Sequence, residues 1–128
     1  MKKLIVLSIM MLMLNVTPAF AKCEGGKVVI GSLNNHEYCV STPAMTWWAA
    51  IAWCEFQGRK LATLNEACSP DGTTINGDQC LNLTHNPEGT KTGWTSTPSN
   101  NGSYYSVDMS THKYNGVSRV HSFRALCY

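Results

Sequence analysis

The stretch from Met45 to Leu64 reads MTWWAAIAWCEFQGRKLATL, and it decides how the rest of the chain is arranged. Four of its residues stand at the spacing i, i+3, i+4 and i+7, namely Trp47, Ala50, Ile51 and Cys54. An α-helix would place all four on one side. Thr46 is suited to the N-cap, because its hydroxyl can accept a hydrogen bond from a free N–H of the first turn. Gly58 is suited to the end of the helix, because it adopts the left-handed conformation without a Cβ clash.

The other sides of this expected helix are apolar as well, because they carry Trp48, Trp53 and Phe56. A helix that is apolar all round must be covered by more than one layer, so we expect neighbouring elements on several of its sides. After Gly58, residues 61–64 (LATL) read as a short extended segment.

The helix and the last strand together carry a resemblance to the C-type lectin-like domain family. The residues that carry it are Trp47, Ala50, Cys54, Gly58, Leu61 and Ala62, followed by 125–128 (ALCY) and, more weakly, 38–41 (YCVS). In that family the Cys of the first helix pairs with the Cys of the closing strand, so the resemblance implies a disulfide between Cys54 and Cys127. The chain looks like a short bacterial secreted form. The middle third does not match, and an unrelated disulfide-rich domain with a Trp-rich helix is the alternative.

Residues 1–21 have the three parts of a secretory signal peptide. Lys2 and Lys3 form a charged start, residues 4–16 form an apolar run, and 19–21 (AFA) form a small-x-small cleavage site. A lipoprotein anchor at Cys23 is the competing interpretation. It is disfavoured because the residue before the Cys of a lipobox is small, whereas Lys22 stands there in this chain. No second hydrophobic run follows, so we expect a domain of residues 22–128 that does not insert into the membrane and is secreted or periplasmic.

The charge of the expected mature chain is balanced. The whole sequence has 10 Lys and Arg against 8 Asp and Glu, and the excess of +2 belongs to Lys2 and Lys3. A neutral chain gives no support to binding of nucleic acid or of an anionic membrane. As a separate expectation, we predict that the mature chain is a monomer.

All six cysteines lie after the signal peptide, and an even number in a short exported chain predicts three disulfides. Cys68 and Cys80 bracket a loop rich in Gly, Asp and Asn, so we pair them as a local staple; the alternative is that one of them reaches across to a strand. Cys23–Cys39 then follows by elimination, and it fits the extra N-terminal bridge of longer family members. No C-x2-C pair is present, so we expect no zinc site.

The rest of the chain reads as short strands and loops. Residues 27–33 and 36–41 suggest a hairpin around an Asn-Asn turn, and residues 93–97, 103–109 and 117–128 suggest further strands. The expected fold is α+β and C-type lectin-like. In it an N-terminal hairpin and the first helix pack on a small antiparallel sheet, and a second small sheet, long loops and disulfide staples complete the domain. Arg119 and Arg124 are expected to be solvated.

The sequence contains no motif that is typical of a calcium-binding or catalytic site. Calcium-dependent members of the family carry paired acidic and amide motifs, and the nearest stretch here is Asn86-Pro87-Glu88, with the residue types in reversed order. We therefore expect no metal site and no cofactor. The sequence has no G-x-S-x-G motif around a nucleophilic Ser, no pair of carboxylates suited to glycoside cleavage and no redox C-x-x-C motif. We therefore expect no catalytic residues and no enzyme activity.

Aromatic and amide side chains on polar loops are the remaining candidates for ligand binding. They are Asn86, Glu88, Trp94, Asn101 and Tyr104. The alternative for Trp94 is that it fills the core of the second sheet. The sequence thus predicts an exported binding module for a glycan or protein ligand, without calcium. A structural or assembly component of a cell-surface appendage is the alternative.

Overall fold

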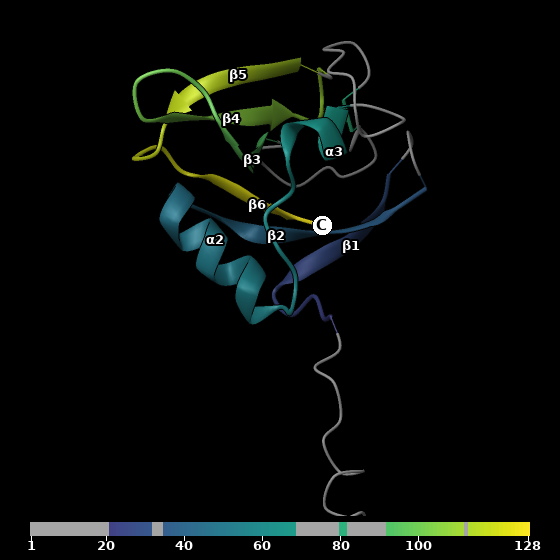
Figure 1. The fold of residues 1–128 in the computed structure, drawn as a ribbon. Coiled ribbons are helices and arrows are strands. Elements are labelled where there is room, and N and C mark those ends of the chain that lie inside the picture. The colour runs from purple at the N-terminus through teal and green to yellow at the C-terminus, as the bar shows by residue number, and fades with distance from the viewer. Residues whose placement is uncertain (1–20, 32–34, 69–79, 82–91, 112) are drawn as a thin grey trace, which may run out of the picture.

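The computed structural model of the chain describes residues 21–31, 35–68, 80–81, 92–111 and 113–128. They form a small α+β domain of short strands and two short helices (Figure 1). In chain order the elements are β1 (Gly26–Ile30), β2 (Glu37–Met45), α2 (Trp47–Phe56), α3 (Leu64–Cys68), β3 (Thr92–Pro98), β4 (Ser103–Asp108), β5 (Lys113–Ser118) and β6 (Phe123–Cys127). The expected signal peptide, apart from Ala21, lies outside the described residues. Among the described helices, none is both long enough and apolar enough to cross a membrane.

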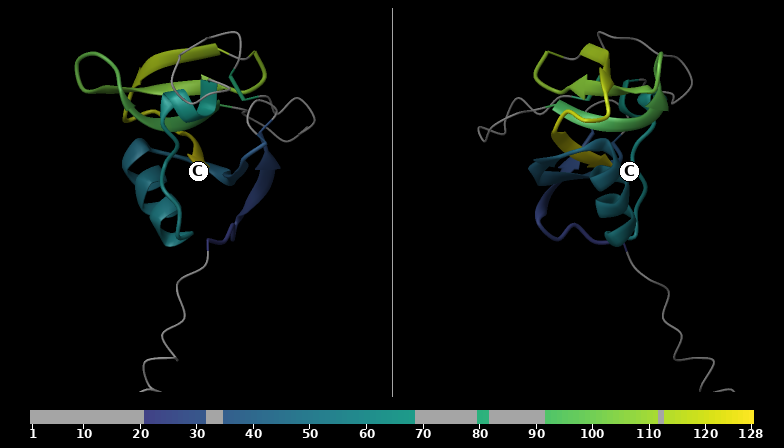
Figure 2. Two further views of the ribbon diagram at one scale, coloured as in Figure 1. Left: turned by 45° about the vertical axis from the view of Figure 1, so that its right-hand side comes forward. Right: turned by 90° about the vertical axis from the view of Figure 1, so that its left-hand side faces the viewer.

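The strands form one six-stranded sheet in the order β1-β2-β6-β3-β4-β5. This corrects the expectation of two separate sheets. Strand β6 pairs antiparallel with β2 and parallel with β3, and the parallel contact consists of Gly93 opposite Arg124 and Trp94 opposite Ala125. The β1–β2 hairpin with α2 therefore lies on one side of β6 and the β3–β5 meander on the other, as two further views also show (Figure 2).

Strand β6 is the centre of the core, because it is buried on both of its faces. Its residues Arg124 to Cys127 are all buried. On the α2 face, Ala125 and Cys127 belong to one cluster with Cys39, Ala50, Cys54, Leu61 and Trp94. On the other face, Leu126 packs with Tyr38, Val40, Ala62, Leu64, Ala67, Cys68, Cys80, Leu81, Val107 and Met109. A strand enclosed on both faces is expected to be a continuous apolar run. Arg124 is the exception. It was expected to be solvated, and that expectation is wrong because Arg124 is buried.

The N-terminal hairpin forms as expected, with shifted bounds. The second strand does not stop near Ser41 but continues to Met45 through Pro43. A proline has no N–H for the ladder, and it is tolerated here because the β2–β6 register shifts between Val40 and Ala44. Within this irregular segment the hydroxyl of Ser41 donates to the carbonyl of Pro43 at 2.7 Å and accepts from the Ala125 N–H at 2.8 Å.

Helix α2 begins and ends where the sequence predicts. The Thr46 hydroxyl accepts from the Ala49 N–H at 3.5 Å. At the other end Gly58 has φ of 69°, its N–H donates to the Glu55 carbonyl at 2.9 Å, and the Arg59 N–H donates to the Cys54 carbonyl at 3.0 Å. These two bonds form a Schellman motif, which satisfies carbonyls that the helix leaves free.

The outer side of α2 is not covered by any element that the structure describes. Trp48 is 49% exposed and Phe56 is 66% exposed, and Ala49 and Ala52 are also exposed. The expectation of several covering layers is therefore wrong for this side. Apolar residues on all sides of the helix predicted the cover, but only the side with Ala50 and Cys54 is fully buried.

Three disulfides tie these elements together, in the same pairs as the sequence analysis proposed. Cys23–Cys39 joins the N-terminal segment to β2, Cys54–Cys127 joins α2 to β6, and Cys68–Cys80 joins α3 to the short segment 80–81. Cys39 and Cys127 are direct partners across the β2–β6 ladder. The first two disulfides therefore lie side by side in the α2-facing core.

Candidate functional site

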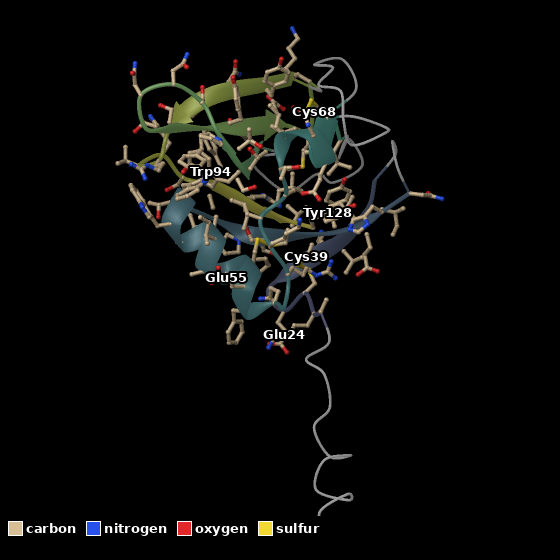
Figure 3. All side chains as sticks on the ribbon, viewed as in Figure 1. Glu24, Cys39, Glu55, Cys68, Trp94 and Tyr128 are labelled. Atoms are coloured by element: carbon tan, nitrogen blue, oxygen red, sulfur yellow. A yellow bond between two sulfur atoms is a disulfide. The ribbon has the colours of Figure 1, made fainter. Side chains whose placement is uncertain are left out.

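The candidate ligand-binding residues from the sequence lie in different surroundings. Asn86 and Glu88 lie outside the described residues. Trp94 lies where the N-terminal end of α2 meets β3 and β6, and its side chain is fully buried (Figure 3). Its indole Nε1–H donates to the Met45 carbonyl at 2.9 Å. Trp94 is therefore a core residue, and the expectation that it offers an aromatic surface to a ligand is wrong.

Tyr104 and Asn101 lie close to the surface at the β3–β4 hairpin. Tyr104 is half-buried on β4, and Asn101 is exposed in the connecting turn. Asn101 and Gly102 both have positive φ, of 53° and 73°. Asn and Gly are the residues that adopt this conformation at the least cost, so the turn places the exposed Asn101 amide beside the start of β4.

Tyr104 belongs to a group of aromatic side chains that surround one arginine. We call this group the aromatic–arginine patch and define it as Trp47, Trp48, Tyr104 and Arg119. The rings of Trp47 and Tyr104 stack with centroids 3.8 Å apart, and those of Trp47 and Trp48 meet edge to face at 6.3 Å. The Arg119 guanidinium carbon lies 4.7 Å from the Trp48 centroid and 5.8 Å from those of Trp47 and Tyr104.

The backbone brings these residues together from three distant parts of the chain. The Trp47 N–H donates to the Arg119 carbonyl at 3.2 Å, which joins the first turn of α2 to the segment after β5. The Trp47 indole Nε1–H donates to the Thr95 carbonyl of β3 at 3.0 Å. Tyr104 pairs with Val117 in the β4–β5 ladder, so Arg119 follows two residues beyond its neighbour. These bonds fix the Trp47 ring and the backbone positions from which the other members of the patch extend.

The patch is open to solvent and carries a positive charge. Trp48 is 49% exposed, and the adjoining Val120 is 68% exposed, whereas Trp47, Tyr104 and Arg119 are half-buried. Cation–π contacts of this kind contribute about 0.5–1 kcal/mol at exposed sites and more where water is excluded. They hold the Arg119 guanidinium in place at the edge of an exposed indole.

A second aromatic group lies at the opposite end of β2 and β6. The His36 ring stacks on that of Tyr128 at 3.6 Å, and Tyr38 meets both rings edge to face. The Tyr38 hydroxyl donates to the Glu66 carbonyl at 2.6 Å, and Tyr38 is almost fully buried. These contacts tie β2 to α3 and β6, so this group serves the core.

The acidic residues of the described part do not gather into a site. No group of three or more His, Cys, Asp or Glu side chains within it is placed to hold a metal ion. Asp108 ends β4 and accepts three hydrogen bonds on Oδ1, from the Ser110 N–H and hydroxyl and from the Thr111 N–H. Partial burial raises the pKa of Asp108, but these hydrogen bonds outweigh it and bring the pKa below its usual value of 3.8.

Comparison with known proteins gives no further guidance. No protein-family model, no curated protein and no solved structure matches this chain.

Sequence reasoning missed three members of the patch. Trp47 and Trp48 were read as apolar residues of a covered helix, and Arg119 was read as a solvated residue. A local signal was available for Trp48, since it does not share the spacing of Ala50 and Cys54, which face the core. None was available for Arg119, because its neighbours are contributed by α2 and β4.

Proposed function

We propose that this chain is an exported binding module with a C-type lectin-like domain, which recognises a glycan or protein ligand through the aromatic–arginine patch and without calcium. The observation that carries the proposal is the exposed Trp48 ring beside the ordered Arg119 guanidinium. Aromatic rings that combine an apolar body with polar neighbours are the usual anchors of recognition surfaces, and Trp and Arg are enriched among residues that dominate binding energy.

The surroundings support binding in preference to catalysis. The patch combines an exposed indole, a phenol, a guanidinium and the nearby Asn101 amide, which supply hydrogen-bond donors and a stacking surface. The resemblance of the helix and closing strand to a family of binding domains supports the same class of function.

Two matched variants test this proposal. Trp48→Ala removes the exposed ring of the patch, and Phe56→Ala removes an even more exposed ring from the far end of the same helix. We expect Trp48→Ala to abolish binding on a glycan array or to a surface-protein library, and Phe56→Ala to leave it unchanged. Binding that survives Trp48→Ala, or silence of the parent protein on both panels, would contradict the proposal.

A structural or assembly role is the second candidate, and one observation favours it. Strand β1 stands at the end of the described sheet, and its side chains Val28 and Ile30 are 53% and 56% exposed. An exposed apolar edge strand is a template for pairing with another chain. Self-association that depends on concentration in gel filtration, lost in Val28→Lys, would support assembly. A monomer at every concentration would count against it.

A further inference from the structure

We infer that the ligand of the aromatic–arginine patch is an acidic saccharide, whose carboxylate pairs with Arg119 while its ring lies against Trp48. The inference rests on the proposed function, since it names the ligand class of that same site.

The first observation is the hydrogen-bonding edge of Arg119. A guanidinium contacts aromatic rings through its flat faces, whereas its N–H donors point outward in its own plane. The rings of Trp47, Trp48 and Tyr104 lie 4.7–5.8 Å from the guanidinium carbon of Arg119, and within the described part of the chain its side-chain N–H groups donate to no protein acceptor. The planar fork of donors matches the two oxygens of a carboxylate.

The second observation is that, among the described residues, this cation has no ion-pair partner. Across the described ranges, no Asp or Glu forms an ion pair with Arg119. Other cations are paired there: Arg59 with Glu37 at 2.7 Å, Lys22 with Glu24 at 3.5 Å, and Lys60 with Glu66 at 3.6 Å. Arg119 is half-buried, so an anion that reaches it is screened by less water than at a fully exposed lysine.

The third observation is the size and polarity of the surface. Beyond Trp48, the large exposed apolar side chain beside Arg119 in the sequence is Val120. The last residue of β5 and the turns before β4 and after β5 carry Ser118, Asn100, Asn101 and His121 at the surface. A specific protein partner needs about 800 Å² with an apolar centre on each side. A saccharide needs one aromatic face for its C–H groups, and amides or hydroxyls for its hydroxyl groups. The patch offers this smaller set.

The side chain of Arg119 can be altered without breaking the backbone contact that positions it. The bond to the Trp47 N–H is made by the Arg119 main-chain carbonyl, and the Trp47 indole is held by Thr95. Arg119→Gln removes the charge and the fork, and Arg119→Lys keeps the charge without the fork. Lys113→Gln makes the same change in net charge at the other end of β5 and serves as the control.

The experiment compares free acids with their methyl esters. Oligogalacturonate and sialyllactose, each as the free acid and as the methyl ester, are titrated into the secreted protein and followed by tryptophan fluorescence. We expect the parent and Lys113→Gln to bind at least one free acid about tenfold more tightly than its ester. Arg119→Gln should remove this preference, and Arg119→Lys should retain part of it.

The outcomes separate this inference from the proposed function. Equal affinity for acid and ester overturns the acidic ligand while leaving a patch that binds sugars. Saccharides that do not bind, together with a protein partner that depends on Trp48, overturn the inference alone. If the protein binds none of the saccharide probes and no protein partner, both the inference and the proposed function are overturned. Indole N–H resonances of Trp47 and Trp94 report whether Arg119→Gln keeps its fold, and if it does not, the comparison of acid and ester on the parent protein decides.

Discussion

Removing the disulfide between Cys54 and Cys127, by replacing both residues with Ala, should cost more stability than removing any other bridge in the chain. This bond joins the last turn of α2 to the end of β6 and spans 73 residues of sequence. It therefore limits the freedom of most of the unfolded domain, and a cross-link stabilises a protein mainly by restricting its unfolded state.

The magnitude follows from the length of the closed loop. In the chain-entropy treatment a loop of 73 residues contributes about 4 kcal/mol, and the nested Cys68–Cys80 bridge shortens that loop by too little to change the figure. The loop of 12 residues between Cys68 and Cys80 contributes about 3 kcal/mol. All four of these side chains are buried, so the two double-alanine variants lose similar apolar contacts and differ mainly in loop length.

The assay is thermal unfolding of the oxidised protein and of both variants, with the remaining bridges verified by peptide mapping. For a domain of this size the Cys54/Cys127 variant should melt roughly 20 °C lower, and the Cys68/Cys80 variant should lose less. An unchanged melting temperature for the first variant, or a larger loss for the second, would show that the link between α2 and β6 does not hold the domain together as reasoned here.

Two further predictions concern residues of the core and of the β4 terminus. Trp94→Phe should lower the free energy of unfolding by about 3 kcal/mol in urea titration, because it leaves the Met45 carbonyl without its donor and removes part of a buried indole, and ligand binding at the patch should persist. Asp108→Asn should reduce the loss of stability in acid. The lowered pKa of Asp108 means that its contribution is present above pH 3.8 and is lost as the pH falls through the folded-state value. Melting temperatures at pH 6 and pH 3 should differ less for the variant, and an equal difference would refute this assignment.

The ends of α2 could be predicted because the signals for them are local. Thr46 and Gly58 act on backbone groups within one turn of their own positions, so the sequence around them contains the whole cause. The short helix α3 has a signal of the same local kind, which our sequence analysis did not use: the Thr63 hydroxyl accepts from the Glu66 N–H, and the Glu66 carboxylate accepts from the Thr63 N–H.

The join between the two halves of the sheet could not be predicted in the same way. Its parallel part has two pairs, Gly93 with Arg124 and Trp94 with Ala125, and no turn or spacing connects residues so far apart in sequence. The burial of individual tryptophans could not be predicted for the same reason. Trp94 stands among Thr and Ser on a polar stretch and is buried, whereas Trp48 stands in an apolar helix and is half exposed, because the partners that decide both are contributed by other elements.

The register of β2 against β6 has a chemical consequence. Cys39 and Cys127 face each other across the two strands, so a thiolate released at either bridge stands beside the sulfurs of the other. Thiol–disulfide exchange between the two bonds is therefore favoured by proximity, and scrambled isomers should form when the chain is oxidised without an isomerase. Cys68 and Cys80 are on the opposite face of the sheet, which confines this reshuffling to four of the six sulfurs.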